Sequence, residues 1–137
     1  MGVILDTSLI IAAERGALRF EDLLRSLGDA PVGVAAITAA ELVHGCHRAV
    51  DPGVRARRTA FVEALLDLVP VIPFGLAAAR QHAHLWATLS EAGRVIGPHD
   101  MLIAATALAR GDALGTLNEG EFGRVPGLRL LPLETFR

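Results

Sequence analysis

The sequence contains no lysine, because all 13 of its basic residues are arginine. A Walker A phosphate loop needs the order Gly-Lys-Ser/Thr, so proteins that bind nucleotides in this way are excluded. Schiff-base chemistry requires an amine side chain, and the chain offers none. The chemistry of the protein must therefore rest on other side chains.

Cysteine and long apolar runs are also scarce. The lone cysteine, Cys46, excludes an intramolecular disulfide and fits a reducing cytoplasm. The composition is 52% hydrophobic, but charges interrupt every apolar run before the roughly 18–20 residues of a membrane span. The first six residues reach an acid without a basic region, unlike a signal peptide. We expect one cytoplasmic domain over residues 1–137, without membrane contact.

The formal net charge is −2, unlike the basic balance of a general nucleic-acid coat protein. This mild acidity leaves a nuclease possible, because carboxylates that hold a metal ion count as negative until the ion is bound. The five histidines form neither an HExxH pair nor a Cys/His zinc spacing. The pattern therefore does not predict a zinc site.

Short apolar runs alternate with helical segments along the chain, which predicts an α/β fold with a mainly parallel sheet. The expected strands are residues 3–5, 32–37, 69–74, 113–117 and, more weakly, 128–133. The expected helices are residues 7–14, 20–27, 38–48, 55–68, 76–92 and 100–110. The run at 69–74 carries two prolines, so we expect it at the edge of the sheet.

Two acids stand beside strongly apolar segments near the start of the chain. Asp6 directly follows the first strand, where the carboxyl ends of parallel strands face a ligand crevice. It is equally well placed to cap the helix that follows. Glu41 lies in an apolar helix, and Thr38 three residues earlier completes a capping-box pattern that would explain it without any function.

Two further acids lie beside apolar segments near the end of the chain, and each also has an explanation that involves no function. Asp100 opens an unusually apolar helix, where the helix dipole alone would stabilise a carboxylate. Glu121 follows a buried strand, and a solvated loop acid is the plain alternative. Taken together, however, such acids would meet at one edge of a parallel sheet. Two carboxylates about 4 Å apart repel by roughly 4 kcal/mol, so a cluster would favour a cation, and oxygen ligands favour Mg²⁺ or Mn²⁺.

Four stretches, in the same order and spacing, resemble the PIN-domain ribonucleases, and most closely the VapC-type toxins of toxin–antitoxin pairs. They are ILDTS at 4–8, TAAELVHG at 38–45, GRVIGPHDMLIAATA at 93–107, and TLNEGEF at 116–122 with VPGL at 125–128. The resemblance spans nearly the whole chain. It implies a three-layer α/β/α sandwich with a central, mainly parallel sheet.

The resemblance also implies a site and a reaction. The acidic residues it assigns to catalysis and metal binding are Asp6, Glu41, Asp100 and, where the family more often has Asp, Glu121. The supporting polar residues it assigns are Thr7, Thr116 and Asn118. The expected reaction is hydrolysis of transfer, ribosomal or messenger RNA with Mg²⁺ or Mn²⁺, leaving 5′-phosphate and 3′-hydroxyl ends. The expected partners are a small VapB-type antitoxin and a second copy of the chain, in a larger assembly that meets operator DNA only through the antitoxin.

Several interpretations stay open on the sequence alone. Arg48 and Arg94 are candidate RNA contacts, although solvated surface arginines are the usual case. His99, beside Asp100, is interpreted as a loop residue. A PIN nuclease of RNA processing or DNA ends is an alternative to a toxin. A second alternative is a degenerate PIN domain that only binds its partner. The intact set of acids disfavours this alternative.

Overall fold

The computed structural model describes all residues, 1–137, and is built on a four-stranded parallel sheet. The strands are β1 (Val3–Leu5), β2 (Val32–Ala35), β3 (Val71–Ile72) and β4 (Ala113–Gly115), in the order β3-β2-β1-β4. The two central strands are fully or almost fully buried, which explains why they read as continuous apolar runs. As expected from its prolines, the third strand lies at an edge.

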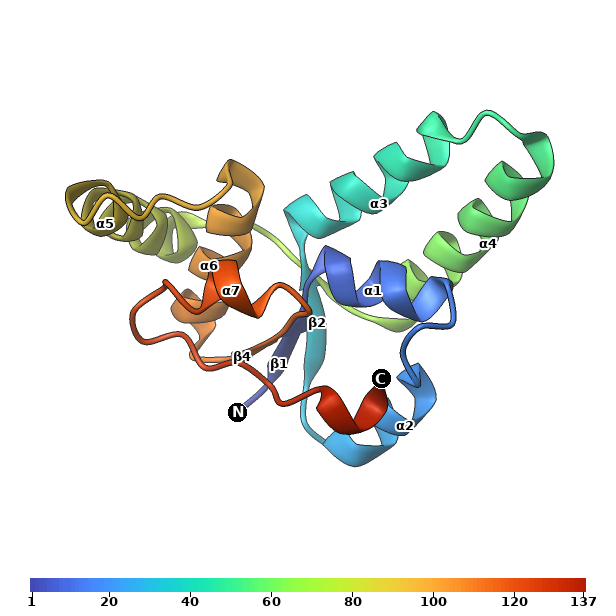
Figure 1. Cartoon of the computed structure of the whole chain (residues 1–137), viewed down its shortest axis with the longest axis horizontal. Coiled ribbons are helices and arrows are strands. Elements are labelled where there is room, and N and C mark those ends of the chain that lie inside the picture. Colours follow the sequence, from blue (N-terminus) through green and yellow to red (C-terminus); the bar gives the residue numbers. More distant parts are fainter.

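Seven α-helices and one short 3₁₀-helix accompany the sheet. They are α1 (Thr7–Glu14), α2 (Phe20–Leu27), α3 (Ala36–Arg48), α4 (Pro52–Leu68), α5 (Leu76–Glu91), α6 (Pro98–Arg110), α7 (Glu119–Phe122) and η1 (Glu134–Phe136). In Figure 1, α1 to α4 lie on one side of the sheet and α5 to α7 on the other. None of the helices is long and apolar enough to span a bilayer.

The sheet separates two hydrophobic cores, which confirms the three-layer sandwich. Val3 and Leu5 of β1 face the core built with α1 to α4, while Ile4 faces the core built with α5 to α7. This division follows from the alternation of side chains along a strand. Phe122 of α7 is completely buried in the second core and fixes that short helix beside the end of β4.

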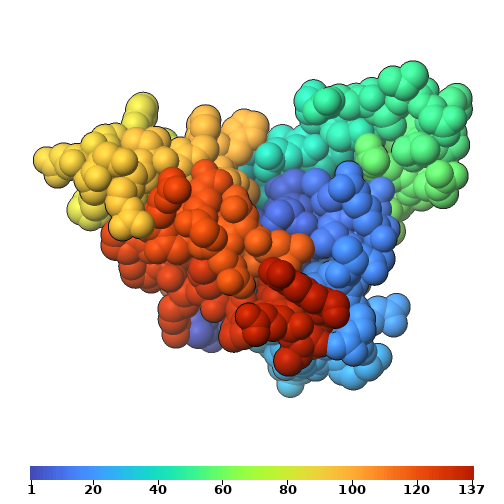
Figure 2. All heavy atoms as spheres, in the orientation of Figure 1, coloured from blue at the N-terminus to red at the C-terminus, as the bar shows by residue number.

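The two halves leave a hollow between them. Figure 2 shows a notch between the lobe formed by α5 and α6 and the lobe formed by α3 and α4. The beginnings of α1, α3 and α6 lie toward the base of this notch in Figure 1, where β1 and β2 end. The carboxyl ends of the parallel strands thus open into the notch.

Several element boundaries differ from the sequence expectation. Strand β2 stops at Ala35 and α3 starts at once, two residues earlier than expected. Helix α4 starts at Pro52, because the Asp51 side chain accepts a hydrogen bond from the backbone of Val54 at 2.9 Å. The weak strand expected at 128–133 reduces to a single bridge between Leu130 and Leu114 of β4.

Candidate active site

Asp6 sits at the end of β1, where it performs two tasks at once. Its exposed fraction is only 2%. One carboxylate oxygen, Oδ1, caps α1 by accepting hydrogen bonds from the Leu9 backbone at 3.0 Å and the Ser8 hydroxyl at 2.8 Å. The other oxygen, Oδ2, accepts one from Thr116. Burial raises the pKa of Asp6, while these hydrogen bonds oppose that rise. Asp6 therefore caps α1 and at the same time belongs to the acidic site.

Glu41 points from α3 toward the start of α1. The Thr7 hydroxyl donates to Glu41 Oε1 at 2.7 Å, and His99 Nδ1 lies 3.3 Å from Oε2. The capping-box explanation of Glu41 is wrong, because Ala35 occupies the N-cap position and makes no side-chain cap bond. Thr38 lies inside the helix instead, buried, with its hydroxyl 3.2 Å from that of Thr7.

Asp100 lies in the first turn of α6 and faces Glu121. Burial and, next, the hydrogen bond and negative charge of Glu121 raise the pKa of Asp100 to about 7. Conversely, the hydrogen bond from Asp100 lowers the pKa of Glu121. Asp6 and Glu41 add further repulsion at Asp100, so the charges of the other three acids all raise the pKa of Asp100. The opposite pKa shifts mean that a proton bound by this pair resides mainly on Asp100.

Glu121 comes from α7, an element that the sequence did not predict because four residues are too few to display helical periodicity. Its Oε1 accepts a hydrogen bond from the backbone N–H of Gly97 at 2.5 Å. Its Oε2 accepts one from the Asn118 side chain at 2.7 Å, and that amide also reaches Asp100 Oδ2 at 3.4 Å. Glu121 is therefore part of the acidic site and not a solvated loop residue, the plain alternative that the sequence offered.

A layer of hydroxyl groups lies behind the acids. Thr116 donates to Asp6 and accepts from the Asn118 backbone at 2.9 Å. Ser8, which the sequence reasoning did not single out, donates to Asp6 and accepts from the Leu117 backbone at 3.2 Å. Its position two residues after Asp6, in the ILDTS stretch, is the sequence feature that indicates this role.

Arg48 and Arg94 are not drawn into the acidic cluster. Both side chains are exposed, and neither forms a hydrogen bond or ion pair in the structure. Arg48 ends α3, about 10 Å along the helix from Glu41 at 1.5 Å per residue. Arg94 lies in the loop between α5 and α6, six residues before Asp100. Both side chains are therefore free to meet a ligand.

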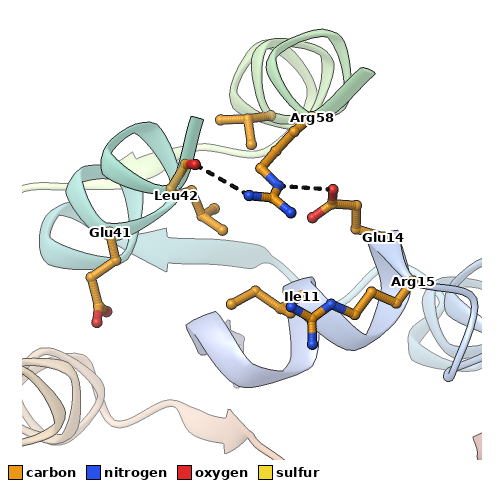
Figure 3. A pocket seen from close by; sticks show the side chains of 8 residues that line it. Ile11, Glu14, Arg15, Glu41, Leu42 and Arg58 are labelled. Carbon is orange, nitrogen blue, oxygen red and sulfur yellow. Dashed lines mark hydrogen bonds and ion pairs between the residues drawn. The ribbon is translucent and has the colours of Figure 1, made fainter. Parts of the chain in front are cut away.

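A small pocket of about 80 Å³ adjoins Glu41 between α1, α3 and α4. On its far side Arg58 pairs with Glu14 at 3.3 Å and donates to the Gly45 carbonyl at 3.2 Å. Figure 3 shows the Glu41 carboxylate directed away from this ion pair. The Glu14–Arg58 pair therefore ties α1 to α4 without neutralising the acidic cluster.

The residues expected from the sequence thus converge at one edge of the sheet, from segments more than 100 residues apart. As the side chains stand, no group of three or more His, Cys, Asp or Glu residues is arranged to hold a metal ion. Hydroxyl groups, N–H groups and His99 contact the carboxylates instead. The arrangement still gathers negative charge that a cation would stabilise.

This fold and site define a PIN domain, and the chain belongs to the PIN-domain family, whose model matches residues 3–128. Among individual proteins, the chain is 37% identical to Ribonuclease VapC1 of Rickettsia felis over 98% of both chains. It is 33% identical to the tRNA(fMet)-specific endonuclease VapC of Shigella flexneri over 76% of both. The crystal structure of VapBC2 from Rickettsia felis bound to a promoter DNA fragment matches with a TM-score of 0.88 and 26% identity, covering 96% of this chain and 98% of the other. These findings confirm the family expected from the four stretches.

Proposed function

We propose that the chain is an endoribonuclease toxin of the VapC type, which hydrolyses RNA phosphodiesters and is neutralised by a VapB-type antitoxin. The observation that carries the proposal is the convergence of Asp6, Glu41 and Asp100 at the carboxyl edge of a PIN sheet. The nearly full-length similarity to a VapC ribonuclease supports the same reaction class.

A divalent cation, Mg²⁺ or Mn²⁺, fits the donor set on its chemistry. Carboxyl groups, the Thr116 hydroxyl and the Asn118 amide surround Asp6 and Asp100, and carboxylate oxygens are ligands that suit hard cations. The raised pKa of both acids means that negative charge is held there at a cost which a cation would offset. We propose that Asp6, Glu41, Asp100 and the more peripheral Glu121 form the acidic surroundings of the ion, after loss of the Asp100 proton.

When bound, such an ion supplies an activated water and stabilises charge on the phosphate. The chain's own residues prepare for this step. Asp6 is fixed by three hydrogen bonds and cannot swing away as the substrate enters. Glu41 is held by Thr7 from one side and by His99 from the other, which sets the direction of its carboxylate. Preorganised charge of this kind stabilises a transition state without rearrangement during the reaction.

The partners follow the same proposal. The notch between the two lobes (Figure 2) would receive the RNA, and the exposed Arg48 and Arg94 would contact its phosphates. A VapB-type antitoxin is the expected inhibitor, because VapBC complexes are the structural neighbours. We further propose a homodimer within a larger assembly, operator DNA contact only through the antitoxin, and a cytoplasmic location that suits the buried free Cys46.

The test is cleavage of total bacterial RNA by purified protein that is free of antitoxin, with Mg²⁺, with Mn²⁺ and with EDTA. Asp6→Asn and Asp100→Asn should abolish cleavage, while Asp67→Asn, an exposed acid on α4 without polar contacts, should not. Discrete fragments that need the metal and both acids would support the proposal. Folded, antitoxin-free protein that cleaves nothing would overturn it in favour of a binding module.

A further inference from the structure

Glu121 differs from the other acids of the site in how its oxygens are used. Both are occupied by N–H donors: Gly97 donates to Oε1 at 2.5 Å and Asn118 donates to Oε2 at 2.7 Å. Glu41, by contrast, is held by the Thr7 hydroxyl and His99, and Asp6 accepts a single N–H, from Leu9, beside the hydroxyls of Ser8 and Thr116. Glu121 is thus the acid of the site whose two oxygens are tied to two different segments, the peptide before α6 and the Asn118 amide.

The contact with Gly97 links two elements that carry site residues. Gly97 is the N-cap of α6 and has no side chain that could cap the helix itself. The Glu121 carboxylate, arriving from α7, ties down the peptide that precedes the first turn of α6. That turn carries His99 and Asp100, so the position of both depends on this connection. The space is close, because a Cβ on residue 97 would stand 3.4 Å from Glu121 Oε1.

The length of the Glu121 side chain matters for this connection. An aspartate would draw the carboxylate back by about 1.5 Å, the length of one carbon–carbon bond. A contact of 2.5 Å would then lengthen beyond the range of a strong hydrogen bond. The glutamate, which stands where the resembling family more often has aspartate, is long enough to bridge from α7 to the start of α6.

We infer that Glu121 is a positioning residue, which sets the start of α6 and thereby Asp100 through the Gly97 N–H, rather than a direct metal ligand. The inference rests on the proposed function, and it gives this fourth acid a role different from that of the other three. In this role the essential property of residue 121 is a hydrogen-bond acceptor at the right distance. A direct ligand would depend instead on the negative charge.

The two roles predict opposite rank orders for two variants. Glu121→Gln keeps the length and one acceptor oxygen but removes the charge, whereas Glu121→Asp keeps the charge but shortens the reach. We expect E121D to lose about tenfold more in kcat than E121Q, because small misplacement of a catalytic group is costly. E121D should also weaken Mn²⁺ binding, measured by calorimetry, more than E121Q does. Glu119→Gln and Glu119→Asp, on the same helix but exposed and without side-chain partners, are the matched controls.

A second variant isolates the donor. Replacing the Ile96–Gly97 amide by an ester, introduced by chemical ligation, removes the N–H of residue 97 without adding atoms. If Glu121 acts through this N–H, the losses of the ester variant and of Glu121→Ala in Mn²⁺ affinity should not add in the double variant. Thermal unfolding of each variant monitors folding.

The opposite order, with E121Q weaker than E121D in Mn²⁺ binding and kcat, would overturn the inference and make Glu121 a charge-dependent ligand. Additive losses for the ester variant and Glu121→Ala would overturn it as well. Failure of the proposed function gives a different result, because the wild-type protein would then cleave no RNA. The Mn²⁺ titrations would still rank the variants in that case.

Discussion

Replacing Asp100 by asparagine should stabilise the metal-free protein at pH 8, although it removes an acid of the site. The carboxyl group of Asp100 has a pKa raised from 3.8 to about 7, first by burial and then by Glu121. Its ionised form therefore opposes folding. Asparagine has no charge to repel Glu121, and its amide can donate to that carboxylate as the protonated acid does.

The magnitude follows from the size of the rise in pKa. At about 1.4 kcal/mol for each factor of ten, a rise from 3.8 to about 7 corresponds to an upper limit of about 4 kcal/mol. Asp100 is only partly buried, so water screens much of this repulsion, and we expect about 1–2 kcal/mol. For a domain of this size that is a rise in Tm of about 3–6 °C.

The pH dependence has a definite sign. Because the native pKa of Asp100 lies above its unfolded value, the wild-type protein loses stability relative to D100N as the pH rises from about 4 to about 7. The difference in Tm should vanish below pH 4 and stay constant above pH 7. Addition of Mg²⁺ should then raise the Tm of the wild-type protein much more than that of D100N.

The assay is thermal unfolding at several pH values, with EDTA and with Mg²⁺. Asp67→Asn is the matched control, because it removes the same charge from an exposed site on α4 and should change the Tm little. The reasoning about the acidic cluster would be refuted if D100N were less stable than the wild-type protein at pH 8 in EDTA. An equal stabilisation at pH 4 and pH 8 would refute it too.

Three further predictions follow from the contacts of the site. Thr116→Val removes a hydrogen bond to the buried Asp6 carboxylate and should lower the free energy of unfolding by about 1–3 kcal/mol. Urea denaturation at pH 7 measures this loss, and an unchanged free energy of unfolding would argue against an ionised Asp6. Thr7→Val should lower kcat by releasing Glu41, and Thr7→Ser should restore most of it, whereas equal losses would point to packing rather than to the hydroxyl. Arg94→Ala should reduce the slope of log Kd for RNA against log salt by about 0.7–1, and an unchanged slope would place Arg94 outside the RNA path.

Most strands and helices were predictable because they depend on local pattern, whereas the three layers were expected from the family resemblance. Buried parallel strands read as short apolar runs, and the helices between them show helical spacing, so β1, α1, α2 and the parallel order of the sheet agree with expectation. The sequence was less informative where the tertiary structure decides the boundary. The spacing of Thr38 and Glu41 matches a capping box and so predicts a helix that starts after Thr38. In the structure α3 begins earlier, at Ala36, directly after β2.

The acids of the site were predictable from their apolar neighbours and from their family resemblance, but their partners were not. Glu41 contacts Thr7, 34 residues away, and His99, 58 residues away. His99 was interpreted as a loop residue, whereas it begins α6 and lies against Glu41. Ser8 was overlooked because a serine after an acid is common at the start of a helix. Contacts across such distances depend on how the helices pack and leave no periodic signal in the chain.

The most direct test of the central claim is the chemistry of the RNA ends produced by the purified protein. Water attack at a site built on Asp6, Glu41 and Asp100 predicts fragments with 5′-phosphate and 3′-hydroxyl ends, and one oxygen of that phosphate should come from labelled water. EDTA should prevent their formation. Fragments with 2′,3′-cyclic phosphate and 5′-hydroxyl ends, formed equally in EDTA, would show attack by the RNA's own 2′-hydroxyl and would contradict the account.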